Sequence, residues 1–328
     1  SDLKKVGRPA VLMSFVPASF EILAFFLFAP HILGIKPIEA AVMGAVLAAV
    51  SPAIVVPRMV RLMVQNYGTD KSIPQLILAG ASCDDIFVIV LFSTFSNITQ
   101  GGNAHLMDFV NIPVSILFGI VLGGITGYLL SLFFETAHAH KHCVRNSMKV
   151  IIVLGISFLL MAIETWMKDI VSISGLLAVV SMACLLKIKS TTFVSKRLSD
   201  KFGKLWLAAE VILFVLVGAA VDIRYTLNAG GAAILMILVA LLFRSVGVAI
   251  CLIRTRLTKK ERFFCILSYL PKATVQAAIG SVPLAMGLPC GQIVLSVAVL
   301  GILITAPLGA ILIDGTYKKL LCQSKNKK

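Results

Sequence analysis

Long apolar runs separated by short polar stretches make up most of this chain of 328 residues. A helix rises about 1.5 Å per residue, so about 20 apolar residues span the ~30 Å hydrocarbon core of a bilayer. The pattern therefore predicts an all-α, polytopic membrane protein with ten transmembrane segments. In chain order these are residues 10–33, 38–57, 73–96, 106–134, 148–166, 170–186, 205–221, 229–253, 263–288 and 293–313.

The polar stretches between these segments are strongly basic. The net charge is +15, although only 14% of the residues are charged and 59% are hydrophobic. In a soluble protein this excess would indicate nucleic acid binding. Here 25 of the 30 Lys and Arg fall in stretches on one side of the predicted membrane, three on the other and two inside segments. By the positive-inside rule, both termini are expected in the cytoplasm of an inner-membrane protein with no nucleic acid partner.

Five ionisable residues lie near the centres of predicted segments: Glu21, Asp84, Asp85, Arg244 and Lys272. Each unpaired charge at that depth costs about 2.5 to 3.5 kcal/mol. Ion pairs that merely join helices are one explanation, but three acids against two bases leave one negative charge in excess. A low-dielectric core tolerates that charge when the carboxylate is protonated or binds a monovalent cation. Such a site is the chemical minimum for cation/proton exchange.

Prolines interrupt two of the predicted segments, at Pro52 and Pro57 in the second and at Pro271 and Pro283 in the ninth. Proline removes a backbone donor and clashes with the preceding helical turn. Ordinary kinks are one interpretation, but paired broken helices are typical of a transporter's binding site. The two segments run in opposite directions, as inverted repeats do. This pairing also matches the first segment with the eighth and predicts two further helices before Ser1.

Three runs carry a family resemblance: Gly80–Ile86 with its adjacent aspartates, Val50–Pro57 and Leu270–Ala278. Together they resemble the monovalent cation/proton antiporters, and most closely bacterial relatives of the NHA-type sodium/proton exchangers. The resemblance implies an NhaA-type inverted-repeat fold with two broken crossing helices. It also implies a homodimer, a core built from residues 10–96 and 229–313, and a connecting and dimerisation part from residues 106–221.

The resemblance also assigns roles to individual residues. Asp85 would be the principal ligand of the proton and of the transported Na⁺ or Li⁺, with Asp84 beside it in the site. Ser51 would lend hydroxyl or backbone oxygens to the ion. No catalytic residue and no cofactor are expected, because the only metal is the transported cation.

Three charged residues would balance the site without binding the ion. Glu21 and Arg244 would form a salt bridge, and Lys272 would offset helix-dipole ends and nearby carboxylates. The charge of Arg244 can be balanced in two ways. If Arg244 neutralises only Glu21, both aspartates can exchange protons, whereas an Arg244 that pairs with Asp84 leaves one.

The sequence thus favours a secondary antiporter that exchanges Na⁺ or Li⁺ for H⁺ by alternating access, and not an enzyme. A Kef-like K⁺ efflux transporter or channel is an alternative, although the tail after Ile313 is too short for a nucleotide-binding domain. A symporter of organic anions is disfavoured by the excess of acid, and a membrane-embedded hydrolase by the lack of a catalytic constellation. Since family members begin with two or three additional helices, an inactive truncated member is the remaining alternative.

Overall fold

The computed structural model describes residues 2–99, 106–139, 145–167, 173, 175–220 and 223–324. Within these residues the chain is helical apart from turns and one isolated antiparallel bridge, between Tyr67 and Gln323. It divides into two compact units, residues 1–102 with 213–328, and residues 103–212.

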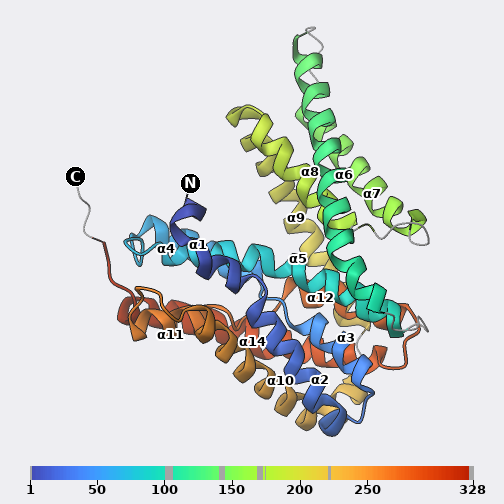
Figure 1. The fold of residues 1–328 in the computed structure, drawn as a ribbon, viewed down its shortest axis with the longest axis vertical. Coiled ribbons are helices and arrows are strands. Elements are labelled where there is room, and N and C mark those ends of the chain that lie inside the picture. The colour runs from blue at the N-terminus through green and yellow to red at the C-terminus, as the bar shows by residue number, and fades with distance from the viewer. Residues whose placement is uncertain are drawn as a thin grey trace. The chain divides into compact units, whose positions relative to one another are not determined.

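The first unit contains the two ends of the chain and ten of the described helices (Figure 1). These are α1 (Asp2–Met13), α2 (Val16–Leu33), α3 (Pro37–Leu47), α4 (Pro52–Val64), α5 (Ile73–Thr99), α10 (Ile223–Cys251), α11 (Lys259–Ser268), α12 (Thr274–Gly280), α13 (Val282–Ala285) and α14 (Gly291–Leu320). Helices α2 and α10 lie side by side, and α3 packs against both α2 and α5. Helices from the beginning and the end of the chain therefore share one core.

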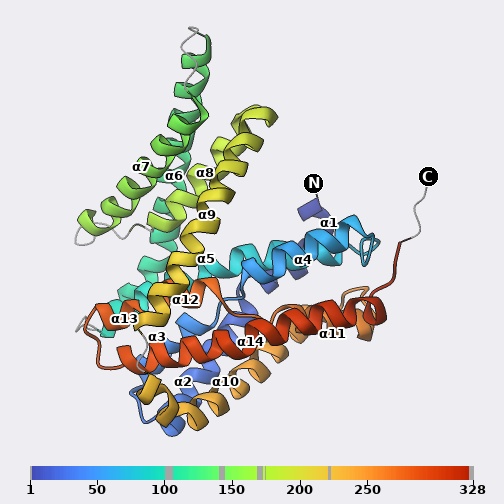
Figure 2. The ribbon, with the colours of Figure 1, turned by 180° about the vertical axis from the view of Figure 1, so that it is seen from behind.

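The second unit is built from α6 (Leu106–Ala139), α7 (Asn146–Met167), α8 (Gly175–Lys189) and most of α9 (Thr192–Ala220), shown from behind in Figure 2. Helix α8 packs against both α6 and α7. Their buried apolar side chains, among them Leu130, Leu160 and Met182, form a core of their own.

Prolines and glycines set several helix boundaries. The predicted segment 10–33 is divided into α1 and α2, because Pro17 in the first turn of α2 has no N–H to continue the preceding helix. Gly34 ends α2 in a left-handed conformation, with φ of 67°, which glycine adopts without steric strain. Pro37 then occupies the first position of α3. A tight α2–α3 hairpin results.

Six stretches of the described helices are long and apolar enough to cross a membrane: residues 7–33, 37–64, 117–136, 147–167, 230–251 and 291–320. Large apolar side chains on these helices point outward, for example Phe158 at 73% exposed and Ile311 at 68%. Soluble monomers seldom expose apolar surface on this scale. The chain is therefore a multi-pass membrane protein.

Glycines let α6 and α8 pack closely in the second unit. A Cβ added at Gly123 would lie 2.0 Å from the carbonyl oxygen of Ala178, and one at Gly127 would lie 2.6 Å from that of Met182. Backbone atoms cannot rotate aside as a flexible side chain can. Gly123 and Gly127, four residues apart on α6, thus mark a close contact between two helices.

Gly123→Ala is expected to destabilise the protein by about 1 to 3 kcal/mol, because α6 and α8 must separate to admit the methyl group. The measurement is thermal unfolding in detergent. Gly124→Ala is the matched control, since nothing lies within 4 Å of a Cβ added there. Equal melting temperatures of the two variants would contradict the close contact.

An ion pair joins the turn before α5 to the first turn of α11. Lys71 Nζ lies 2.8 Å from Glu261 Oε2, and the same oxygen accepts the backbone N–H of Thr258 at 2.6 Å. The Thr258 hydroxyl in turn accepts the Glu261 N–H, which completes a capping box. Burial alone raises the pKa of Glu261, but hydrogen bonds from Lys71 and Thr258 outweigh it and hold the pKa below its ordinary value of 4.5.

Glu261→Gln is expected to lower stability by about 1 kcal/mol near neutral pH. A carboxyl whose pKa is lower in the folded state stabilises the fold above its unfolded pKa, and this stabilisation disappears as pH falls through the folded pKa. The difference between the two proteins should therefore narrow in acid. Melting curves from pH 8 down to pH 3 test this, and a difference independent of pH over that range would refute the role of the ionised carboxylate.

Candidate ion-binding site

Two helix interruptions meet in the first unit. The first separates α3 from α4 at residues 48–51, and the second separates α11 from α12 at residues 269–273. They are joined by a hydrogen bond of 2.8 Å from the Ser51 backbone N–H to the Pro271 carbonyl. Both breaks fall where prolines predicted them, and each leaves backbone groups that need partners from elsewhere.

Side chains from the C-terminal half satisfy the carbonyl groups freed by the first break. Lys272 Nζ and Gln276 Nε2 both donate to the Leu47 carbonyl, the latter at 3.3 Å. Arg244 donates to the Ala48 carbonyl, and Gln276 donates to the Ala49 carbonyl at 2.8 Å. Three consecutive carbonyls are thus paired with polar side chains of α10, α12 and the second break.

Arg244 of α10 is fully buried and serves four acceptors. Its guanidinium lies 2.9 Å from Glu21 Oε2 on α2 and 2.8 Å from Asp84 Oδ2 on α5. Its Nε donates to the Tyr269 carbonyl at 2.6 Å, in addition to the Ala48 contact. The planar fork of five N–H groups suits this arrangement. Arg244 therefore pairs with both of its candidate partners, Glu21 and Asp84.

A second buried ion pair completes the cluster. Lys272 Nζ lies 2.6 Å from Glu21 Oε1, and both side chains are at most 1% exposed. Glu21, Asp84, Arg244 and Lys272 therefore form a buried quartet with two negative and two positive charges. These four residues balance one another, and no charge of the quartet is left over.

Asp85 is outside this quartet. It is half-buried beside Asp84 on α5, and its Oδ1 is buried without a hydrogen-bond partner among the described residues. None of the ion pairs found in the described part of the chain involves Asp85. The surplus negative charge inferred from the sequence thus falls on this residue.

Other unpaired oxygens lie near the same break. Asp84 uses Oδ2 to accept from Arg244 and, at 3.1 Å, from the Val50 N–H. Its Oδ1 and the Ser51 hydroxyl are both buried without a partner in the described structure. Carboxylate and hydroxyl oxygens are the ligands that a hard cation such as Na⁺ prefers. The N–H that anchors Asp84 belongs to Val50, and the unpaired hydroxyl belongs to the next residue, Ser51.

Gln276, Tyr269 and Thr305 belong to this region although charge counting did not identify them. Tyr269 is fully buried, with its ring 5.6 Å from the Arg244 guanidinium carbon. A Cβ added at Gly80, one turn before Asp84, would lie 2.0 Å from the Tyr269 hydroxyl oxygen. The signal in the sequence was weak, because neutral polar residues are common in membrane helices.

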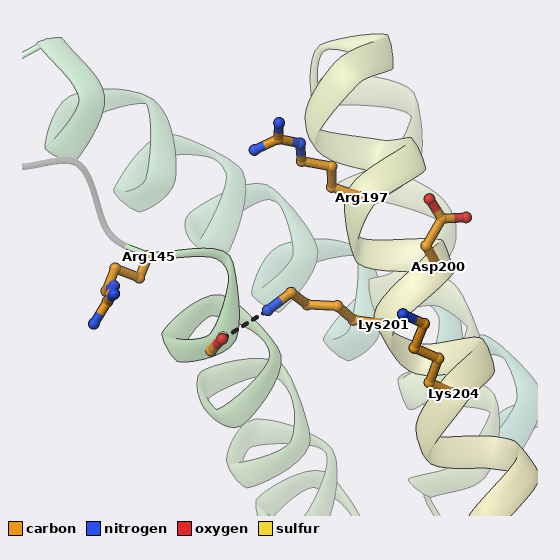
Figure 3. A pocket seen from close by; sticks show the side chains of 6 residues that line it. Arg145, Arg197, Asp200, Lys201 and Lys204 are labelled. Atoms are coloured by element: carbon orange, nitrogen blue, oxygen red, sulfur yellow. Dashed lines mark hydrogen bonds between the residues drawn. The ribbon is translucent and has the colours of Figure 1, made fainter.

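A groove with a volume of about 610 Å³ lies elsewhere, at the beginnings of α7 and α9 in the second unit (Figure 3). It is lined by Arg145, Ser147, Arg197, Asp200, Lys201 and Lys204. Lys201 reaches across it to donate to the Ser147 hydroxyl at 2.6 Å. The groove contains none of the predicted site residues, and its basic composition is that of a solvated polar stretch between apolar segments.

Comparison with solved structures gives a match to the sodium proton antiporter MjNhaP1 from Methanocaldococcus jannaschii. The TM-score is 0.80 over 97% of this chain and 80% of that protein, with 21% sequence identity. At this identity the likeness establishes the fold.

Sequence comparison gives relatives that are more similar. Human sodium/hydrogen exchanger 9B2 is 32% identical over 97% of this chain, and human sodium/hydrogen exchanger 9B1 is 31% identical over 85%. The chain spans 60% and 54% of the lengths of these two proteins. The model of the family described as "Sodium/hydrogen exchanger, transmembrane" matches residues 1–318. The chain therefore belongs to the transmembrane sodium/hydrogen exchanger family.

Proposed function

We propose that the protein to which this chain belongs is a secondary antiporter that exchanges Na⁺ or Li⁺ for H⁺. The observation that carries the proposal is the charge balance of the site. The buried quartet is neutral by itself, and Asp85 beside it has no basic partner among the described residues. A half-buried carboxylate in that position is stable when it holds a proton or a monovalent cation.

Competition between the two ions follows from this arrangement. A proton on Asp85 removes the charge that attracts the cation, and a bound cation removes the negative charge that attracts the proton. Asp84 Oδ1 and the Ser51 oxygens would complete the coordination of Na⁺ or Li⁺, while Arg244 and Lys272 keep the rest of the site neutral. Because either ion satisfies the same carboxylate, the site holds one of them at a time, as exchange requires.

The proposal also includes the membrane topology and the roles of the two units. Besides the six apolar stretches, α5, α8, α9 and the α11–α12 pair would cross the membrane, giving ten spans with both termini in the cytoplasm. The helices would form inverted repeats with the two breaks as their counterparts. The first unit would act as the transport core, and the second would connect it and form a homodimer in the cell's inner membrane.

Ion flux in proteoliposomes tests the function. The intact protein is reconstituted, the lumen is made acidic, and a pH-sensitive dye reports proton release when Na⁺, Li⁺, K⁺ or choline is added outside. Na⁺ and Li⁺ are expected to release protons, and protein-free liposomes give the background. No response to any alkali cation would refute antiport.

The same assay distinguishes antiport of Na⁺ or Li⁺ from the alternative function, K⁺ efflux. A Kef-like pathway would respond to K⁺ more strongly than to Na⁺ or Li⁺, and a channel would dissipate a K⁺ gradient without moving protons. The family membership favours Na⁺, since the matching family model is that of sodium/hydrogen exchangers.

A further inference from the structure

Gln276 is a buried polar residue of this region to which the ion-exchange scheme gives no role. Its side chain on α12 is fully buried. The amide nitrogen Nε2 donates to the Ala49 carbonyl at 2.8 Å and more weakly to the Leu47 carbonyl at 3.3 Å. Both acceptors belong to the interruption between α3 and α4, so Gln276 links the second interrupted segment to the first.

The Ala49 carbonyl and the Val50 N–H belong to one peptide group. The described chain contains no cis peptide bond, so these two dipoles point to opposite sides of a planar unit. Gln276 donates to the carbonyl on one side, and the N–H on the other side donates to Asp84 Oδ2 at 3.1 Å. A continuous hydrogen-bond chain thus runs from Gln276 through the peptide to Asp84.

Such a chain has two physical effects. Donation to the carbonyl polarises the peptide and strengthens its N–H as a donor to the carboxylate. It also fixes the rotation of the peptide plane, which sets where the next residue, Ser51, places its oxygens. With Oδ2 of Asp84 held by Val50 and Arg244, the free Oδ1 keeps one orientation.

We propose that Gln276 is a positioning residue for cation binding, which acts on Asp84 and Ser51 through the peptide between Ala49 and Val50. The inference rests on the proposed antiport at Asp85. Without the amide donor, the Ala49 carbonyl is left buried and unpaired, and the peptide rotates to find another partner. The oxygens around the cation lose their fixed spacing, whereas Asp85 itself still takes up and releases protons.

A purely structural role for Gln276 predicts a different outcome, and Val297 provides the matched control. Val297 on α14 is fully buried in the same apolar cluster as Ala49 and Val275, the neighbour of Gln276. Its side chain carries no hydrogen-bonding group. Val297→Ala therefore leaves a cavity in this core and lowers stability without disturbing the hydrogen-bond chain to Asp84.

The experiment compares wild type, Gln276→Met, Gln276→Leu and Val297→Ala as intact proteins in proteoliposomes. Gln276→Met keeps the length of the side chain, Gln276→Leu keeps much of its volume, and both remove the amide donor. Both are expected to raise the apparent KM for Na⁺ about tenfold while the maximal rate stays within about twofold. Val297→Ala is expected to lower the melting temperature comparably and to leave KM unchanged.

Three outcomes would overturn the inference: a wild-type KM in both Gln276 variants, an equal rise in KM for Val297→Ala, or loss of folding in both Gln276 variants while Val297→Ala folds. Failure of the proposed function has a separate signature. In that case wild type itself shows no cation-driven proton release, or Asp85→Asn retains it.

Discussion

Exchange is expected to fall to the level of protein-free liposomes when Asp85 is replaced by Asn. The amide has nearly the same shape, but it carries no charge to attract Na⁺ and cannot take up a proton near neutral pH. The buried quartet is untouched, because none of its ion pairs involves Asp85. The fold should therefore survive, with a stability in the absence of Na⁺ within about 1 kcal/mol of wild type.

Asp84→Asn is the informative comparison for this prediction. Asp84 accepts from Arg244 at 2.8 Å and from the Val50 N–H at 3.1 Å, so its replacement leaves the quartet with one excess positive charge. That variant should lose stability as well as exchange, whereas Asp85→Asn should lose exchange alone. Na⁺-dependent thermal stabilisation measured beside the flux separates the two cases. Undiminished exchange by Asp85→Asn would contradict the assignment of the principal ligand.

Hydropathy predicted where helices lie better than where they begin and end. The predicted segment 205–221 covers only the apolar part of α9, which begins at Thr192, because a hydropathy pattern does not register a basic helical stretch. Likewise the predicted segment 10–33 is two helices, since Pro17 interrupts the hydrogen bonding of an otherwise continuous apolar run. Both differences arise from backbone hydrogen bonding, which average hydrophobicity does not contain.

The charged residues of the site could be identified from the sequence because a charge inside an apolar segment is costly and therefore conspicuous. Which of these residues pair with one another could not be identified from the sequence. The sequence left Arg244 with either Glu21 or Asp84, whereas the guanidinium reaches both at 2.9 Å and 2.8 Å. Its forked geometry makes these partners compatible, but only the positions of α2, α5 and α10 decide whether both lie in reach.

The neutral polar residues were harder to recognise for a related reason. Gln276 matters because the break at residues 48–51 frees carbonyls that its amide can reach. The prolines predict that such carbonyls exist, but not which residue from another part of the chain pairs with them. Thr305 is a similar case, since its partner is the backbone N–H of Lys272 in the second break.

The largest loss of stability is expected for Arg244→Met. The substitution keeps much of the side-chain volume but removes every donor, so Glu21 Oε2, Asp84 Oδ2 and the carbonyls of Ala48 and Tyr269 lose a partner at once. Breaking a buried ion pair from one side costs about 3 to 5 kcal/mol, and each unpaired carbonyl adds about 1 to 3 kcal/mol. The variant should accumulate poorly in membranes and aggregate on size-exclusion chromatography in mild detergent.

Arg244→Lys separates the charge of this residue from its geometry. An ammonium keeps the quartet neutral, but its three donors cannot serve four acceptors that a planar fork reaches from one position. Arg244→Lys should therefore lose an intermediate amount of stability, about 1 to 3 kcal/mol, and folded protein should still be recovered. A free energy of unfolding of Arg244→Met within about 1 kcal/mol of wild type would contradict this account. The quartet would then not be what keeps these charges in the core, and Asp85 would no longer be the single carboxylate left for the ions.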